Sequence, residues 1–203
     1  TFMSKDSSEY YHNGLLFKSE TVDSLTYVRN CIFKHANTAI ESQSSNPSIT
    51  DNLFEFNSTA IHGDGGASPI ITGNLFKNNT GYSIHTYPQR IRGNIYGNTY
   101  ENNTRQYIHV ADGTLNEDMT YEWLRDGVPY YINTDVHVQS DNDINKTPIL
   151  NIESGTTIIF NDQRKIIVNN SNNINHKGAL QADGVTFMSK DSSEYYHNGL
   201  LFK

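Results

Sequence analysis

The stretch VRNCIFKHANTAIE, residues 28–41, decides the fold because three later stretches repeat its pattern. These are ITDNLFEFNSTAIH (49–62), ITGNLFKNNTGYSIH (71–85) and IYGNTYENNTRQYIH (95–109). An aromatic residue takes the same place in each stretch, and successive aromatics are 21, 22 and 24 residues apart. A short period with drifting length is typical of stacked structural repeats, in which small insertions fall in turns.

Aligning the four stretches places residues of one kind in columns. The first column is apolar, the second is aromatic and the third is isoleucine. The members are Val28, Ile49, Ile71, Ile95; Phe33, Phe54, Phe76, Tyr100; and Ile40, Ile61, Ile84, Ile108. A coil of this length cannot bury its apolar face alone, so the columns are predicted to stack inward as the core of an all-β solenoid, a parallel β-helix.

Asparagine forms two further columns at fixed offsets from the apolar ones. Three residues after the first column come Cys31, Asn52, Asn74 and Asn98, and three residues after the aromatic column come Asn57, Asn79 and Asn103. An amide both donates and accepts, so identical amides on successive coils are predicted to form ladders that satisfy buried backbone groups at the bends. Cys31 would end the first ladder. The alternative is that asparagine only marks loops.

The other half of the chain consists of short alternating strands with glycine between them. It opens with Pro129-Tyr130, continues through residues 150–160 (LNIESGTTIIF) and reaches 178–187 (GALQADGVTF). With the asparagine coils, these motifs resemble the right-handed parallel β-helix repeat family, in particular large prokaryotic adhesin-like and surface tandem-repeat proteins. The resemblance covers roughly residues 121–203 and 1–109. It implies the fold more than an activity, because one scaffold carries lyases, glycosidases, sugar-binding proteins and inert stalks.

Residues 1–18 recur letter for letter as residues 186–203. Chance cannot match 18 positions, so the chain is interpreted as a window on a tandem array whose repeat is about 185 residues long. About eight coils spaced by about 4.8 Å would make each repeat about 38 Å long. The expected partners are neighbouring copies of the same repeat, joined end to end.

Segment 110–128 departs from the coil pattern and holds the only tryptophan, Trp123. The organisation is therefore predicted as the C-terminal part of one β-helix module in 1–115, a module junction in 116–128 and the N-terminal part of the next module in 129–203. Trp123 is expected to plug a core end, because an open solenoid end exposes apolar surface and strand edges.

Composition limits the partners. The formal net charge is −7, which argues against nucleic acid and anionic membrane surfaces. One cysteine gives no disulfide framework, and no apolar run approaches the length of a membrane span.

The sharpest candidate for chemistry is the column that follows the inward isoleucines: Glu41, His62, His85 and His109. Alternation places these side chains outside, about 4.8 Å apart. Two imidazoles at that separation can reach one divalent cation, with the glutamate nearby. The alternative is a solvated histidine ladder produced by duplication, since no Cys or Asp completes a closed ligand set. No other cofactor is expected.

Catalytic residues are not predicted, because no two acids on neighbouring coils in 28–109 share a column. Asp141, Asp143 and Asn145 alternate like the start of a calcium loop, but Lys146 stands at the sixth position, so the segment is interpreted as a polar turn.

The 13 tyrosines suggest a carbohydrate-binding face, with Tyr87 and Tyr107 as candidate sugar contacts. If the protein is exported, the sequons at Asn78, Asn102, Asn145 and Asn169 are candidate glycosylation sites. The function predicted is a non-enzymatic, extracellular or cell-surface protein that forms a stalk, filament or adhesin. The alternative is a carbohydrate-binding or polysaccharide-degrading β-helix protein.

Overall fold

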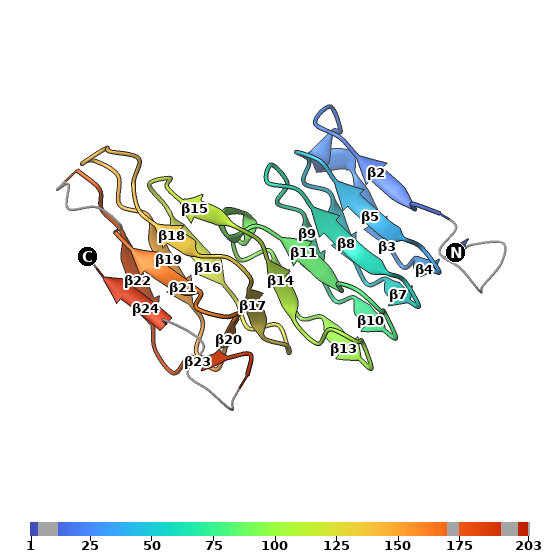
Figure 1. The fold of residues 1–203 in the computed structure, drawn as a ribbon. Coiled ribbons are helices and arrows are strands. Elements are labelled where there is room, and N and C mark those ends of the chain that lie inside the picture. Colours follow the sequence, from blue (N-terminus) through green and yellow to red (C-terminus); the bar gives the residue numbers. More distant parts are fainter. Residues whose placement is uncertain (4–11, 170–174, 192–198, 203) are drawn as a thin grey trace. The chain divides into compact units, whose positions relative to one another are not determined.

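The structure is a computed structural model that describes residues 1–3, 12–169, 175–191 and 199–202. Figure 1 shows the chain as a ribbon with its strands labelled. The chain divides into two compact units. Unit 1 comprises residues 1–86, 94–108 and 126–128, and unit 2 comprises 87–93, 109–125 and 129–203. Apart from two single-turn 3₁₀ helices, η1 (Asp23–Leu25) and η2 (Pro88–Arg90), the regular elements described are short β-strands.

Unit 1 is built from coils of three strands, and each strand pairs in parallel with the strand three places later in the chain. One sheet contains β1 (Phe2–Met3), β4 (Ile32–Lys34), β7 (Leu53–Glu55), β10 (Leu75–Lys77) and β13 (Thr99–Glu101). A second contains β3 (Tyr27–Arg29), β6 (Ser48–Thr50), β9 (Ile70–Thr72) and β12 (Ile95–Tyr96). The third contains β2 (Leu15–Phe17), β5 (Thr38–Ser42), β8 (Thr59–Gly63) and β11 (Ile84–Thr86). The parallel coils confirm the predicted solenoid.

The predicted columns set the register of these sheets. Phe33 pairs with Phe54, Phe54 with Phe76, and Phe76 with Tyr100. The three phenylalanine side chains are fully buried, as are the isoleucines of the third column. Alternation explains this, because successive residues of a strand point to opposite faces and one face of each short strand lines the core.

Unit 2 follows the same three-strand rule with less regular sequence. Its sheets are β15 (Gly113–Leu115), β18 (Val136–Val138), β21 (Lys165–Val168) and β24 (Gly199–Phe202); β16 (Thr120–Trp123), β19 (Ile149–Ile152) and β22 (Ala179–Ala182); and β17 (Tyr130–Ile132), β20 (Thr157–Phe160) and β23 (Thr186–Ser189). The strand β14 (Ile108–Val110) contributes His109 and Val110 to this unit.

Segment 110–128, which includes the predicted module junction at 116–128, contains regular strands. It carries β15, which pairs with β18, and β16, which pairs with β19 from Thr120↔Ile149 to Trp123↔Ile152. The pattern is hidden because Tyr121 and Trp123 fill the inward positions that smaller residues fill elsewhere. Trp123 is fully buried within a coil of unit 2, with its ring 5.2 Å from that of Tyr130. The two units also differ from the predicted modules: 87–93 belongs to unit 2, and 126–128 belongs to unit 1.

Candidate functional site

The first asparagine ladder runs through unit 1 at the bend between two sheets. Asn52 Nδ2 donates to Asn74 Oδ1 (3.0 Å), and Asn74 Nδ2 donates to Asn98 Oδ1 (3.1 Å). The same oxygens also accept the backbone N–H of the preceding rung, at 3.0 Å in both cases. Cys31 starts the ladder, since its N–H donates to Asn52 Oδ1 (2.9 Å). The side-chain oxygens of Asn74 and Asn98 therefore each satisfy two donors of the coil before them, and that of Asn52 satisfies one.

The second ladder has the same construction one bend later. Asn57 Nδ2 donates to Asn79 Oδ1 (3.1 Å), and Asn79 Nδ2 donates to Asn103 Oδ1 (2.9 Å). Each Nδ2 also donates to a carbonyl of the preceding coil: Phe33 O, Phe54 O and Phe76 O at 3.0, 2.9 and 2.9 Å. All six ladder asparagines are buried. Because a buried polar group without a partner is costly, these bonds make the narrow bends tolerable.

The residue before each rung explains why the asparagine points inward. In the first ladder it is Asp51, Gly73 or Gly97, with φ of 56°, 66° and 69°. In the second it is Phe56, Asn78 or Asn102, with φ of 58°, 53° and 52°. A single residue in the left-handed conformation turns the chain sharply, and glycine and asparagine adopt this conformation most readily. The sharp turn then leaves the next side chain inside the bend.

Asp126 occupies the place that follows Asn98 in the first ladder, within unit 1. Its Oδ1 accepts the N–H of Asn98 (2.8 Å), and its Oδ2 accepts Asn98 Nδ2 (2.9 Å) and the Tyr100 hydroxyl (2.6 Å). The ladder directs its donors toward this position, so a carboxylate, which only accepts, terminates it. Burial raises the pKa of Asp126, and the bonds from Tyr100 and Asn98 oppose that rise.

The sequence prediction missed Asp126. Rungs of the first ladder are 22 and 24 residues apart, whereas Asp126 follows Asn98 by 28 residues. The left-handed residue also comes after Asp126, at Gly127 (φ 76°), instead of before it. The sequence signal that could have identified this rung is the turn-forming pair Asp126-Gly127, which lies near the place where the next bend is expected.

The proposed metal column is only partly assembled. Glu41 pairs in register with His62, and His62 with His85, and the two imidazole centroids are 4.6 Å apart. Glu41 accepts from Gln43 Nε2 at 2.6 Å. His109 alternates with the buried residues Ile108 and Val110 and is itself buried in unit 2, with its ring 6.1 Å from that of Tyr131, so this member of the column is covered from solvent. Among the residues that the structure describes, no group of three or more His, Cys, Asp or Glu is placed to hold a metal ion.

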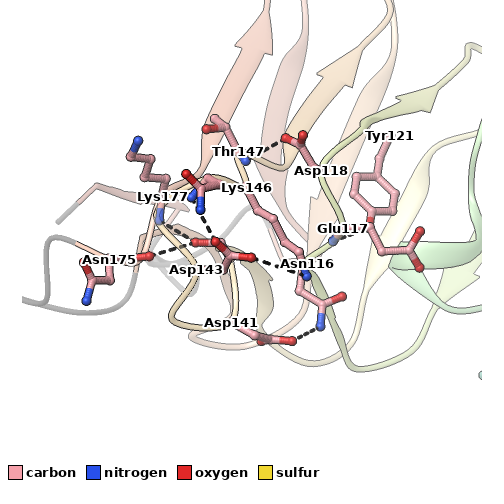
Figure 2. Close-up of polar contacts among 12 residues, drawn as sticks. Asn116, Glu117, Asp118, Tyr121, Asp141, Asp143, Lys146, Thr147, Asn175 and Lys177 are labelled. Carbon is pink, nitrogen blue, oxygen red and sulfur yellow. Dashed lines mark hydrogen bonds and ion pairs between the residues drawn. The ribbon is translucent and has the colours of Figure 1, made fainter.

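Polar loops of unit 2 are linked at one corner of successive coils (Figure 2). Asn116 Nδ2 donates to Asp141 Oδ2, and the N–H of Thr147 donates to Asp118 Oδ1 at 2.9 Å. Within the suspected calcium segment, the N–H of Asn145 donates to Asp143 Oδ1 (2.9 Å). The carboxylates thus accept hydrogen bonds from neighbouring backbone and side-chain amides, as is typical of polar turns.

A second acid-rich contact surrounds Tyr121 in unit 2. Its hydroxyl accepts the N–H of Glu117 (3.0 Å), and Arg92 lies 5.7 Å from its ring centre and pairs with Glu117 at 2.8 Å. Burial raises the pKa of the Tyr121 hydroxyl. These contacts fasten the segment before β16 to its own strand.

The candidate sugar contacts do not share a surface within either unit. Tyr87 belongs to unit 2 and Tyr107 to unit 1, and both are half-buried. The candidate glycosylation sites divide by exposure: Asn102 and Asn145 are exposed, whereas Asn78 and Asn169 are half-buried. A hollow of about 530 Å³ lies at unit 2, and its lining includes Val168, His176 and Phe202.

Comparison with known families gives one match. The family described as "right handed beta helix region" matches residues 6–122, which is more than half of the chain. Neither the curated proteins nor the solved structures contain a match. No described helix has the length and apolarity to cross a membrane.

Proposed function

The chain belongs to the right-handed β-helix family, and from that premise we propose that it is a structural tandem-repeat protein. Its repeated coils would form a stalk, surface filament or adhesin outside the cell. The proposal goes beyond the family, whose scaffold serves both enzymes and inert rods. Neighbouring copies of the repeat are the proposed partners.

The observation that carries the proposal is the recurrence of 1–18 as 186–203. Both copies form parallel strands on a solenoid coil: β1 and β2 pair with β4 and β5, and β23 and β24 pair with β20 and β21. A sequence that repeats as coil structure supports elongation by stacking, because each coil contacts only its neighbours.

The use of polar groups in the coils supports a structural role as well. Asp126 accepts the last hydrogen bonds of a ladder, and Asp118, Asp141 and Asp143 accept hydrogen bonds within and between turns. Such groups rigidify the coil, and continuous backbone pairing along the axis makes a rod stiff and resistant to proteases. The net charge of −7 per chain keeps repeated copies soluble.

Electron microscopy of the protein extracted from its native source tests the proposal. We expect rods with an axial repeat near 38 Å, from about eight coils spaced by about 4.8 Å. Isolated globular particles would contradict it.

A glycan screen tests the rival, sugar-binding function. A ligand whose binding is lost in both Tyr87→Ala and Tyr107→Ala, and retained in the exposed-site control Tyr96→Ala, would replace the structural proposal. We expect no such ligand if the repeats serve a structural role.

A further inference from the structure

The two copies of the 18-residue segment contact different neighbours: the first copy pairs with the coil after it, and the second copy pairs with the coil before it. Resting on the proposed tandem array, we propose that strands β23 and β24 serve as strands β1 and β2 of the next repeat and form a joint coil. This coil would pair with β20 and β21 behind it and with β4 and β5 of the following repeat ahead of it. The partner is thus a second copy of this chain, joined without a flexible linker.

The copy at the end of the chain shows the backward contacts. In β23, Phe187 pairs with Ile158, and its ring lies 6.2 Å from that of Phe160. In β24, Leu200 pairs with Ile166 and Phe202 pairs with Val168. Ile158, Phe160, Ile166 and Val168 are buried, so the segment is seated on the core of unit 2.

The copy at the start of the chain shows the forward contacts. The ring of Phe2 stacks on Phe33 with a centroid distance of 4.8 Å and an interplanar angle of 4°. Leu15 pairs with Ile40, and Phe17 pairs with Ser42. The N–H of Asn37 also donates to His12 O at 2.9 Å. The same sequence therefore caps the core of unit 1.

The side chains face the same way in both copies. Phe2 is in register with buried Phe33, and its equivalent Phe187 is in register with buried Ile158. Likewise Leu15 and its equivalent Leu200 are each paired with a buried isoleucine. A shift of one residue would reverse every orientation, so the agreement means that one coil can serve both neighbours.

The backbone bonds also use different residues of the segment. Backward, the N–H groups of Thr186 and Lys190 donate to Thr156 O and Phe160 O, both at 2.9 Å. Forward, Phe17 O, the equivalent of Phe202 O, accepts the N–H of Gln43 at 2.7 Å. No bond of one set competes with a bond of the other.

Exposure changes as expected for a coil that has lost one neighbour. Phe202 is 62% exposed, whereas its equivalent Phe17, with β5 ahead of it, is half-buried. Phe2 is 38% exposed, whereas Phe187, with β20 behind it, is half-buried. Each copy leaves apolar surface on the side where the other copy is covered.

Gly14 adds a specific requirement for a following coil. A Cβ at this position would lie 1.8 Å from Ala39 O, the backbone of the next coil. Only glycine allows that approach. Its equivalent, Gly199, lies in the copy at the end of the chain and would meet the same backbone in the next repeat.

The test is hydrogen exchange on a two-repeat chain, residues 1–203 followed by 19–203, compared with the 203-residue chain. In the joint, amide exchange of residues 199–202 is expected to slow by at least about tenfold, because a strand at an open edge frays and an internal one does not. Exchange equal to that in the 203-residue chain would overturn the joint.

A matched pair of variants locates the contacts. Leu200→Ser, at an inward position of the shared segment, is expected to speed exchange both in 165–168 of the first repeat and in 38–42 of the second. Leu201→Ser, at the neighbouring outward position, is expected to change neither by more than about twofold. Faster exchange in 165–168 alone would overturn the forward contact.

The outcomes separate the joint from the proposed function. Folded repeats linked by a fast-exchanging segment would overturn the joint and leave the structural role. A specific glycan ligand would overturn the structural role and leave the joint.

Discussion

Unit 1 and unit 2 use the same three-strand coil, and in both of them carboxylates accept backbone N–H groups of neighbouring coils, as Asp64 does from Ser44 in unit 1 (3.0 Å). Unit 1 differs in having two buried amide ladders. In unit 1, buried asparagine amides run from coil to coil at two narrow bends. In unit 2, exposed carboxylates reach to a neighbouring coil, as Asp118 does forward to Thr147 N–H and Glu153 does backward to Arg125 N–H (2.7 Å). Unit 1 also stacks like aromatics, whereas unit 2 mixes Tyr121, Trp123, Leu150 and Phe160 in its core.

The difference shows two solutions to one problem. A buried amide ladder needs identical residues at fixed spacing, so it constrains the sequence, and its asparagine rungs do not titrate. Carboxylate-to-backbone bonds in wet corners tolerate loops of different length, but each contributes less because water competes. Unit 1 should therefore depend on single corner residues, and unit 2 should not.

The largest effect is expected at the centre of the first ladder. Asn74→Ala removes the acceptor of Asn52 N–H and Asn52 Nδ2 and the donor to Ile49 O (2.9 Å). Leaving these buried groups unpaired should lower the free energy of unfolding of unit 1 by about 3–5 kcal/mol, measured by native-state hydrogen exchange.

The matched control lies in unit 2. Asn151 is half-buried and its Nδ2 donates to Glu122 Oε2 at 2.6 Å. Asn151→Ala should cost about 1 kcal/mol or less. Equal costs at Asn74 and Asn151 would remove the distinction between the units.

The next effect concerns the one charged rung. Asp126→Ala leaves Asn98 and Tyr100 without their acceptor and should cost about 2–4 kcal/mol. Asp126→Asn keeps an acceptor oxygen and should cost much less, because an amide with this bonding already forms every other rung. Urea titration of both variants measures their free energies of unfolding. A larger loss of stability in Asp126→Asn than in Asp126→Ala would argue against the role of Asp126 as the acceptor that ends the ladder.

The pH dependence of this rung has a definite sign. Because burial raises the pKa of Asp126 above its ordinary value of 3.8, the folded state holds the proton more tightly than the unfolded state. The stability that this carboxyl contributes is complete below pH 3.8 and is lost as the pH rises through the raised pKa. Relative to Asp126→Asn, the wild type should therefore lose stability over that window. A constant difference between the two proteins would show an unshifted carboxyl.

A smaller effect is expected at the corner of unit 2. Asp118→Ala removes the acceptor of Thr147 N–H in a wet loop and should cost about 0.5–1 kcal/mol, read from hydrogen exchange in 147–152. A cost as large as that of Asn74→Ala would mean that carboxylate corners are as critical as ladders.

The smallest effect is expected at the surface of unit 1. Lys34 Nζ lies 2.6 Å from Glu55 Oε2, with the two side chains 30% and 14% exposed. Glu55→Gln should cost about 0.2–1 kcal/mol, and less in high salt. Thermal melts at low and high salt measure it, and a cost that does not change with salt would exclude an electrostatic origin.

The sequence was most informative where coils repeat with little change. The three apolar columns and both ladders follow from fixed offsets around Phe33, Phe54 and Phe76, because backbone pairing forces equivalent residues into register. Prediction reached less far where the coil length changed: Asp126 was not recognised as a rung, and the strands β15 and β16 within 110–128 were not recognised. The burial of His109 could not be predicted, because the spacing of residues in the sequence does not show which outward positions are covered by neighbouring side chains.

Diffraction from aligned rods of a multi-repeat chain tests the central claim most directly. If the repeats stack as continuous parallel coils, a strong meridional reflection near 4.8 Å should appear, because that is the spacing of neighbouring strands along the axis. Diffraction without a meridional reflection at that spacing, or with it perpendicular to the rod axis, would contradict the account.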